Sequence, residues 1–281
     1  MGFDDIRLSP IAGTWYPASP QALAAEVDHY LAQAAARLPR LDGEVVGVVA
    51  PHAGIRYSGP VAGYAFAAVQ GMAPDVVAVV APMHYPYRQP LLTTAHSAYA
   101  TPLGEIPVAH DLLAVLGDRL EARIGLRPTA VLNDPEHALE IELPFLQRAL
   151  SKPFRLLPLM LRDYRPSVCQ ALGETLAEIL AGQSALLVAS TDLSHYYPAN
   201  VARQLDEHML RRIAALDPEG VLRAEREGTG FACGAGPVAA VLWASKALGA
   251  RRGVVLHYAT SGDVTGDYTS VVGYGAVAIL R

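Results

Sequence analysis

Residues 44–52 read EVVGVVAPH, a run of small and β-branched apolar residues that ends at a proline and a histidine. A run of this length and composition is typical of a strand buried on both faces of a sheet. The pattern returns in residues 75–84, DVVAVVAPMH, and in residues 185–195, ALLVASTDLSH. Because helical patterns separate the three runs, they predict an α/β fold with a mostly parallel sheet.

Helical and strand patterns fill most of the remaining chain. We expect helices over residues 20–38, 60–70, 110–122, 135–150, 166–180 and 236–248, and further helical structure between about 200 and 226. Shorter strands are expected over residues 91–98, 105–108, 154–161, 254–258 and 271–279. The sequence contains no internal repeat and no long linker, so we expect one domain over residues 1–281.

The composition narrows the class of protein. The chain has 22 Lys and Arg against 27 Asp and Glu, and it has no basic block, so nucleic acid is not an expected partner. Its apolar runs are far shorter than the roughly 20 residues that cross a bilayer, and its acidic N-terminus is unlike a signal peptide. The two cysteines, Cys169 and Cys233, are too few for a disulfide framework, which favours a cytoplasmic protein.

Histidines follow all three buried-strand patterns. His52 and His84 come directly after the first two runs, and His195 follows the third together with Asp192. Ligands of parallel α/β sheets bind beyond the carboxyl ends of the strands, so these side chains are expected to meet in one crevice. A single histidine after a strand is more often a hydrogen-bonded loop residue. The prediction therefore depends on the equivalence of the three positions.

Cys233 lies between glycines, directly before a predicted helix. The positive end of a helix dipole favours the thiolate, which is the form that binds metal or attacks carbon. The alternative is a small buried apolar residue, which is what most free cysteines are. Cys169 lies inside an amphipathic helix pattern, and we assign it to the core.

Residues 134–140, DPEHALE, are expected to open a helix, since acids suit a first turn. His137 and Glu140 are three residues apart and would share one helical face, as a metal-binding or acid-base pair does. A solvated, capped helix start without a functional role is the alternative.

Five motifs run in order along nearly the whole chain. They are AGTWYP at 12–17, APHAGIRYSG at 50–59, EHALE at 136–140, STDLSHY at 190–196 and ACG at 232–234. Each motif is short, but their combination resembles the Memo family, which is also called AmmeMemoRadiSam system protein B in bacteria. That family is related in fold to the class III extradiol ring-cleavage dioxygenases, which use non-haem Fe(II). The resemblance implies a three-layer αβα sandwich with a metal crevice, and His52, His84 and Cys233 as the metal ligands.

The resemblance also assigns roles to five residues around the metal. His195 matches the histidine that serves the dioxygenases as acid and base, and His137 matches a histidine that contacts the ligands or the substrate. Asp192 would line the same pocket, so His195, His137 and Asp192 form the expected catalytic set. Trp15 and Tyr57 match aromatic residues that wall the pocket, and they form the expected substrate-binding set.

The sequence departs from these patterns at two places. The loop after the second strand usually reads PSHH in the family, but residues 82–85 read PMHY. The dioxygenases have a carboxylate at the position where the family has a cysteine, which is Cys233 in this chain. Two imidazoles with a carboxylate leave open positions on Fe(II) for O₂ and substrate. Thiolate is softer and suits Zn²⁺ or Cu(I) as well. We therefore expect a divalent metal, with Fe(II) first and zinc or copper as alternatives.

Three functions are compatible with these residues. The first is a metal-dependent oxidoreductase that acts on a small, chelating aromatic substrate, with His195 taking a phenolic proton. The second is a binding module that holds a peptide or small ligand in the same pocket without turnover, as the signalling relatives in eukaryotes suggest. The third is hydrolysis by Cys233 with His195 as its base, which needs the two side chains about 3 Å apart. The sequence leaves the oligomeric state open.

Overall fold

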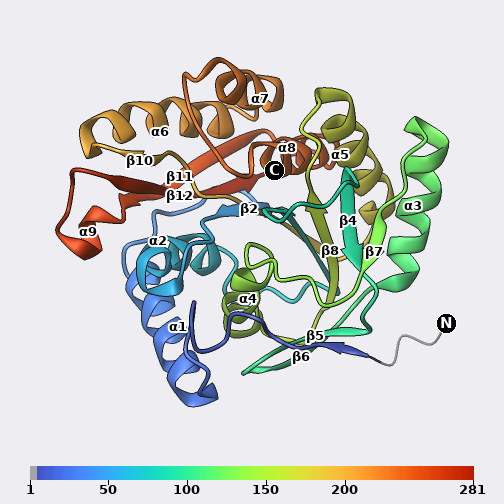
Figure 1. Cartoon of the computed structure of the whole chain (residues 1–281), viewed down its shortest axis with the longest axis horizontal. Helices are drawn as coiled ribbons and strands as arrows, with labels where there is room; N and C mark the ends of the chain where they lie inside the picture. The colour runs from blue at the N-terminus through green and yellow to red at the C-terminus, as the bar shows by residue number, and fades with distance from the viewer. Residues whose placement is uncertain (1–4) are drawn as a thin grey trace.

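The centre of the protein is a set of parallel strands, seen in a computed structural model that describes residues 5–281. These strands are β2 (Val45–Ala50), β9 (Ala185–Ser190), β3 (Val76–Pro82) and β8 (Arg155–Leu161). They pair in the order β2, β9, β3, β8, and every pair is parallel. Figure 1 labels the two outer members of this set, β2 and β8. Nearly all their residues are buried, because helices cover both faces, and the apolar runs in the sequence are the consequence.

Antiparallel strands extend this centre on both sides. Beside β2 lie β12 (Val271–Leu280), β11 (Arg252–Thr260) and the short β10 (His195–Tyr197). Beside β8 lie β4 (Leu91–Thr94), which is antiparallel to it, and β7 (Thr129–Val131), which is parallel to β4. The sheet is therefore mixed, and its parallel pairing is concentrated in the centre.

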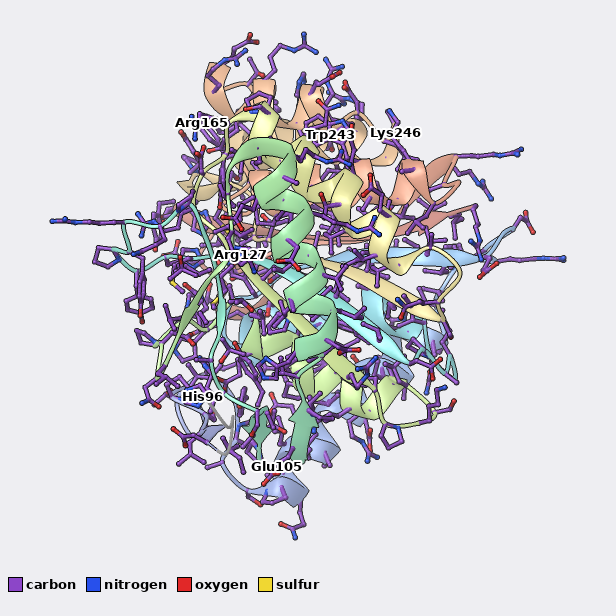
Figure 2. The ribbon with its side chains drawn as sticks, turned by 90° about the vertical axis from the view of Figure 1, so that its right-hand side faces the viewer. His96, Glu105, Arg127, Arg165, Trp243 and Lys246 are labelled. Carbon is purple, nitrogen blue, oxygen red and sulfur yellow. The ribbon has the colours of Figure 1, made fainter. Side chains whose placement is uncertain are left out.

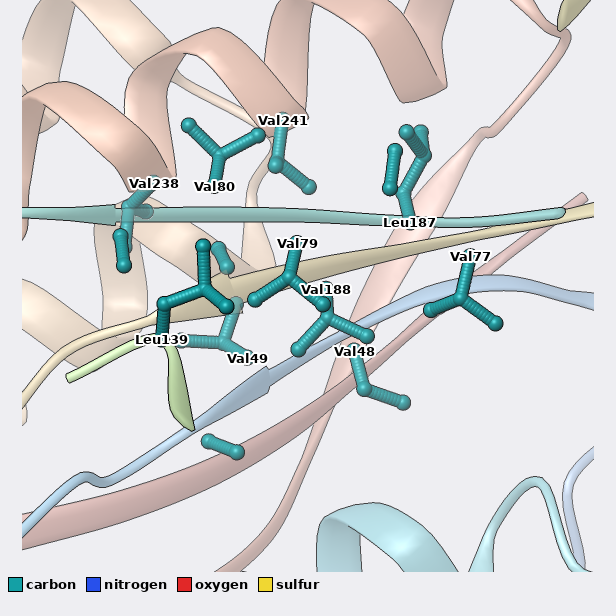
Figure 3. Packing of buried hydrophobic residues seen from close by; sticks show 14 of the residues in the cluster. Val48, Val49, Val77, Val79, Val80, Leu139, Leu187, Val188, Val238 and Val241 are labelled. Carbon is teal, nitrogen blue, oxygen red and sulfur yellow. The ribbon is translucent and has the colours of Figure 1, made fainter. Parts of the chain in front are cut away.

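Helices form the outer layers of the predicted sandwich, so the α/β class is confirmed. One side carries α3 (His110–Ile124), α5 (Pro166–Leu180), α6 (Ala199–Ala214), α7 (Pro218–Glu227) and α8 (Ala235–Ala247); the other carries α1 (Pro20–Ala35), α2 (Ile55–Ala67) and α4 (Leu143–Ala149). Figure 3 shows Val238 and Val241 of α8 packed over the strands that carry Val79 and Val188. Among residues 5–281, no helix is both long enough and apolar enough to cross a bilayer.

A second, small sheet lies at the end of the molecule near the N-terminus. It consists of β1 (Ile6–Arg7), β5 (Ala98–Thr101) and β6 (Gly104–Pro107). Figure 2 views the molecule from the side of α3, with Glu105 of β6 below that helix. The small sheet matters for the site because β1 places Arg7 beneath the segment that carries His137.

The structure corrects two predicted helices and one loop. The helix expected from residue 60 begins at Ile55, because the Ile55 N–H bonds the Trp15 carbonyl and starts the helix ahead of Pro60. The helix expected from residue 135 begins only with the 3₁₀ turn η1 (Glu140–Glu142) and α4. The loop expected after β9 contains β10, and a further short helix, α9 (Gly262–Thr265), precedes β12. Cys169 is buried in α5, as predicted.

The contact between α5 and α8 depends on Gly173. A Cβ atom at this position would lie 2.4 Å from the Ala240 carbonyl oxygen and 2.6 Å from the Trp243 Cβ, so the helices would have to separate. We expect Gly173→Ala to lower the free energy of unfolding by about 1–3 kcal/mol, although alanine favours helices. Urea unfolding measures this, and Ser167→Ala, on the exposed face of α5, is the matched control. Unchanged stability in Gly173→Ala would contradict the close packing.

Candidate metal centre

Three loops meet at the carboxyl edge of the central strands. Because β2, β3 and β9 are parallel, their carboxyl ends share one edge of the sheet. His52 follows β2, His84 follows β3, and Asp192 follows β9. The Asp192 carboxylate ties two of these loops together, because its Oδ1 accepts hydrogen bonds from the backbone N–H groups of His52 (2.8 Å) and Ala53 (3.3 Å).

Three imidazoles lie together at this edge. One ring nitrogen from each of His52, His84 and His137 lies within 4.8 Å of the other two, a grouping that could hold a metal ion. The ring centroids are 5.2 Å apart for His52 and His84, 5.5 Å for His52 and His137, and 4.8 Å for His84 and His137. The structure thus brings two of the expected ligands together with His137, which the sequence analysis placed in the catalytic set.

Burial favours the neutral, metal-binding form of His52 and His137. Burial lowers the pKa of His52 well below its usual range, and the neighbouring His84 and His137 lower it further. Burial also lowers the pKa of His137 to about 4, against the opposing charge of Glu136. Neutral imidazole offers a nitrogen lone pair to a metal, whereas imidazolium offers none.

The Glu136 carboxylate contacts the Nδ1 atoms of two of the imidazoles, His84 and His137. Its Oε1 lies 3.0 Å from the His84 Nδ1 and 3.3 Å from the His137 Nδ1, and its carboxylate also accepts the backbone N–H groups of His84 and His137. Burial alone would raise the pKa of this carboxyl, but the hydrogen bond and charge of His84 hold it below its usual range. A buried carboxylate in this position orients imidazoles for metal binding.

Replacing Glu136 with glutamine is expected to weaken metal binding by about 10–100-fold. The amide NH₂ of glutamine would face N–H donors of His84 and His137, where the carboxylate has an accepting oxygen. Titration of the metal-free protein with Zn²⁺ measures the affinity. Asp206→Asn makes the same change at a buried carboxylate that bonds the backbone of Ser194, outside the imidazole group, and should leave the affinity unchanged. Equal affinities for wild type and Glu136→Gln would show that Glu136 does not orient the imidazoles.

The segment that carries His137 is irregular because side chains hold its backbone. Asp134 Oδ1 accepts the Glu136 N–H at 3.2 Å, and Glu136 Oε1 accepts the N–H groups of His137 and Ala138, each at 2.9 Å. These bonds take the place of helical ones. The helical pairing of His137 with Glu140 was therefore wrong.

Arg7 fixes this segment to the small sheet. Its guanidinium bonds the Asp134 carboxylate at 2.9 and 3.0 Å and the Glu136 carbonyl at 2.9 Å, and it also pairs with Glu140. Tyr16 donates to the other Glu140 oxygen at 2.6 Å. Arg7 and both carboxylates are buried, and Arg7 pairs with each carboxylate, so neither one is buried without a cationic partner.

Cys233 lies beside His52 and outside the group of three imidazoles. Its Sγ is 3.1 Å from the His52 Nε2 and accepts the Asp192 backbone N–H at 3.3 Å. Burial raises the pKa of the Cys233 thiol, and the nearby Asp192 raises it further, so the surroundings oppose the thiolate expected from the helix dipole. Burial likewise raises the pKa of Asp192 to about 7.

The remaining expected residues surround this site at different distances. The Trp15 ring stacks on His137 with centroids 4.0 Å apart. His195 is half-buried on β10, and burial lowers its pKa, with a smaller contribution from His84 in the same direction. Tyr57 is 38% exposed on α2, and the contact resolved for its ring is with Arg56. Trp15 is thus in direct contact with the imidazole of His137, whereas Tyr57 lies toward the surface.

Comparison with known proteins identifies the family. The family model described as Memo-like protein matches residues 7–278 of the chain. The chain belongs to the Memo family. A MEMO1 family protein of Methanopyrus kandleri is 34% identical over 291 residues, which cover 98% of this chain and 99% of that protein. A MEMO1 family protein of Methanothermobacter thermautotrophicus is 35% identical, covering 96% and 98%, and one of Nitrosopumilus maritimus is 31% identical, covering 98% and 100%.

The motifs that resemble the Memo family all reach the site. They supply Trp15, His52, His137, Ser190 and Cys233. Two groups of residues that hold the histidines were not predicted from the sequence: Glu136 with Arg7, and Ser190 with Glu142. Glu136 stands next to His137 in its motif, and this position could have indicated it. Arg7 is brought in from more than a hundred residues away, and no local pattern indicates it.

Proposed function

We propose that this Memo family protein is a metal-dependent oxidoreductase, and that His52 and His84 bind a divalent metal, with Fe(II) as the first choice. The proposal rests on the three imidazoles within 4.8 Å of one another. The arrangement fits a metal because the Nδ1 atoms of His52 and His84 are held by Ser190 and Glu136, at 2.9 and 3.0 Å. Metal-binding histidines commonly use their second nitrogen in this way, which leaves the first for the metal.

The third protein ligand is either His137, which belongs to the imidazole group, or Cys233, which the family resemblance implies. Imidazoles suit Fe, Zn and Cu, whereas a thiolate would shift the preference toward Zn²⁺ or Cu(I). Metal analysis of His137→Ala and Cys233→Ala, each compared with wild type, distinguishes these two assignments. The variant that loses its metal identifies the ligand.

With His137 as the third ligand, the site favours a chelating, anionic substrate. Three imidazoles bring no negative charge to a divalent metal, and a vicinal dihydroxy-aromatic compound supplies two oxygens that can carry it. Bound iron would supply coordination sites for substrate and O₂. The chain would contribute His195 as the acceptor of a phenolic proton, and Trp15 and Tyr57 as aromatic contacts.

Iron-loaded protein, prepared without air and mixed first with catechol and then with O₂, tests the proposal. We expect catechol to change the iron spectrum and O₂ to be consumed in its presence. If catechol binds and no O₂ is consumed, the protein is a binding module. If neither occurs, the oxidoreductase proposal is wrong.

Hydrolysis by Cys233 has less support from the geometry. Within residues 5–281, the histidine nitrogen that contacts the Cys233 Sγ is that of His52, at 3.1 Å, and not that of His195. Burial also opposes ionisation of the thiol. The binding module remains the second candidate, since the stacked rings of Trp15, His137 and His84 form an aromatic column that could hold a planar ligand.

A further inference from the structure

Ser190 lies between three polar groups behind the imidazoles. Its Oγ is 2.7 Å from the Ala138 carbonyl oxygen, 2.6 Å from the Glu142 Oε1 and 2.9 Å from the His52 Nδ1. Ser190 and Glu142 are fully buried, and His52 is 2% exposed. The positions of the hydrogen atoms in this cluster therefore depend on which of these protein groups donate and which accept.

Counting hydrogen atoms leaves one arrangement that satisfies all three contacts. A hydroxyl donates one hydrogen and accepts two, and a carbonyl oxygen only accepts. The Ser190 hydroxyl must therefore donate to Ala138, since otherwise two oxygens would face each other at 2.7 Å with no hydrogen between them. His52 and Glu142 must then both donate to the Ser190 Oγ. His52 does so with an Nδ1–H, and Glu142 does so with a protonated carboxyl group.

We propose that Glu142 is a positioning residue that carries a proton and, through Ser190, holds His52 in the tautomer whose Nε2 faces the metal. The inference rests on the proposed function only for the metal. The tautomer and the proton on Glu142 are properties of the protein alone.

The surroundings of Glu142 agree with a neutral carboxyl group. Burial raises the pKa of Glu142 well above its usual range. Within the described chain, 5–281, its second oxygen has no hydrogen-bond partner, which would be costly for a buried carboxylate oxygen. Glu142 comes from η1, directly behind the segment of His137, so one short stretch contributes to the positions of two imidazoles.

The surroundings of Cys233 agree with the same tautomer of His52. The Cys233 Sγ accepts the Asp192 N–H, and the His52 Nε2 at 3.1 Å is a nearer acceptor for its own hydrogen than the Asp192 carbonyl oxygen at 3.6 Å. A thiol that donates to Nε2 requires a lone pair there, which is the nitrogen state that a metal needs.

Two spectroscopic measurements on the metal-free protein test the proposal. Nitrogen-15 NMR of the His52 ring should show a hydrogen on Nδ1 and a lone pair on Nε2. The infrared spectrum should contain the carbonyl stretch of a protonated carboxyl group that disappears in Glu142→Gln. A hydrogen on Nε2, or the absence of that infrared difference, overturns the proposal.

Metal titration separates positioning from simple packing. Glutamine can donate to Ser190 as the protonated acid does, so Glu142→Gln should keep the His52 tautomer and bind Zn²⁺ within about threefold of wild type. Glu142→Leu cannot donate, and Ser190→Ala removes the acceptor of the His52 Nδ1–H, so each should weaken Zn²⁺ binding by about 10–100-fold. Ser245→Ala, at another buried serine, is the matched control and should bind as wild type does.

The outcomes distinguish this inference from the proposed function. If wild type does not bind Zn²⁺ but shows the expected tautomer and infrared band, the metal proposal fails and the assignment of Glu142 stands. If wild type binds Zn²⁺ and Glu142→Gln loses affinity as Glu142→Leu does, the assignment of Glu142 fails. The nitrogen-15 spectrum is recorded on the wild-type protein. It therefore decides the tautomer of His52 even if a Glu142 variant is too unstable for metal titration.

Discussion

Replacement of His52 with alanine is expected to remove the bound metal. His52 belongs to the imidazole group, and both of its ring nitrogens have assigned contacts, Nδ1 with Ser190 and Nε2 on the side of Cys233. Loss of a partner that only supports a ligand costs about 10–100-fold in affinity, so loss of the ligand itself should cost more than about 100-fold. Metal analysis after anaerobic loading with Fe(II), together with Zn²⁺ titration, measures the effect.

His29→Ala is the matched control for this variant. His29 lies exposed on α1 and bonds Gln33, so its removal takes away one imidazole without touching the site. We expect His29→Ala to keep the wild-type metal content. A His52→Ala protein that is folded and still holds one metal per chain would show that the metal lies elsewhere.

Replacement of His195 with alanine is expected to lower turnover by about 10²–10⁴-fold while metal content stays nearly intact. The reason is that His195 is proposed to move a proton, and general base catalysis contributes this much. It lies on β10, outside the group of three imidazoles. Turnover by iron-loaded protein and its metal content are measured on the same sample. Loss of metal together with turnover would instead identify His195 as a ligand.

The pH dependence of wild type gives a second measurement of His195. A general base must be neutral, so turnover should be present above the pKa of the base and fall as the pH drops through it. Because burial lowers the pKa of His195, this fall should lie below pH 6.5, the usual value for histidine. His195→Gln, which cannot accept the proton, should lose this limb of the profile. An unchanged limb in His195→Gln would exclude His195 as the titrating base.

The sequence by itself determined the centre of the fold and the edge where the site lies. The runs at 45–50, 76–81 and 185–190 are apolar along nearly their whole length, as is typical of strands covered on both sides by helices. Parallel pairing then places their carboxyl ends at one edge. The positions of His52 and His84 followed from this local information, and the five motifs indicated the Memo family that the comparisons show.

Only the tertiary structure decided how the histidines are grouped and held. His137 was expected on a helix, but Arg7, which is 127 residues from Asp134 in the sequence, fixes an irregular segment that turns His137 toward His52 and His84. The contact of Ser190 with Glu142 is likewise set by packing between β9 and η1. Local patterns encode strands because burial and backbone bonding repeat along the chain, whereas buried polar clusters form between distant segments, and their hydrogen bonds exist only once the fold is complete.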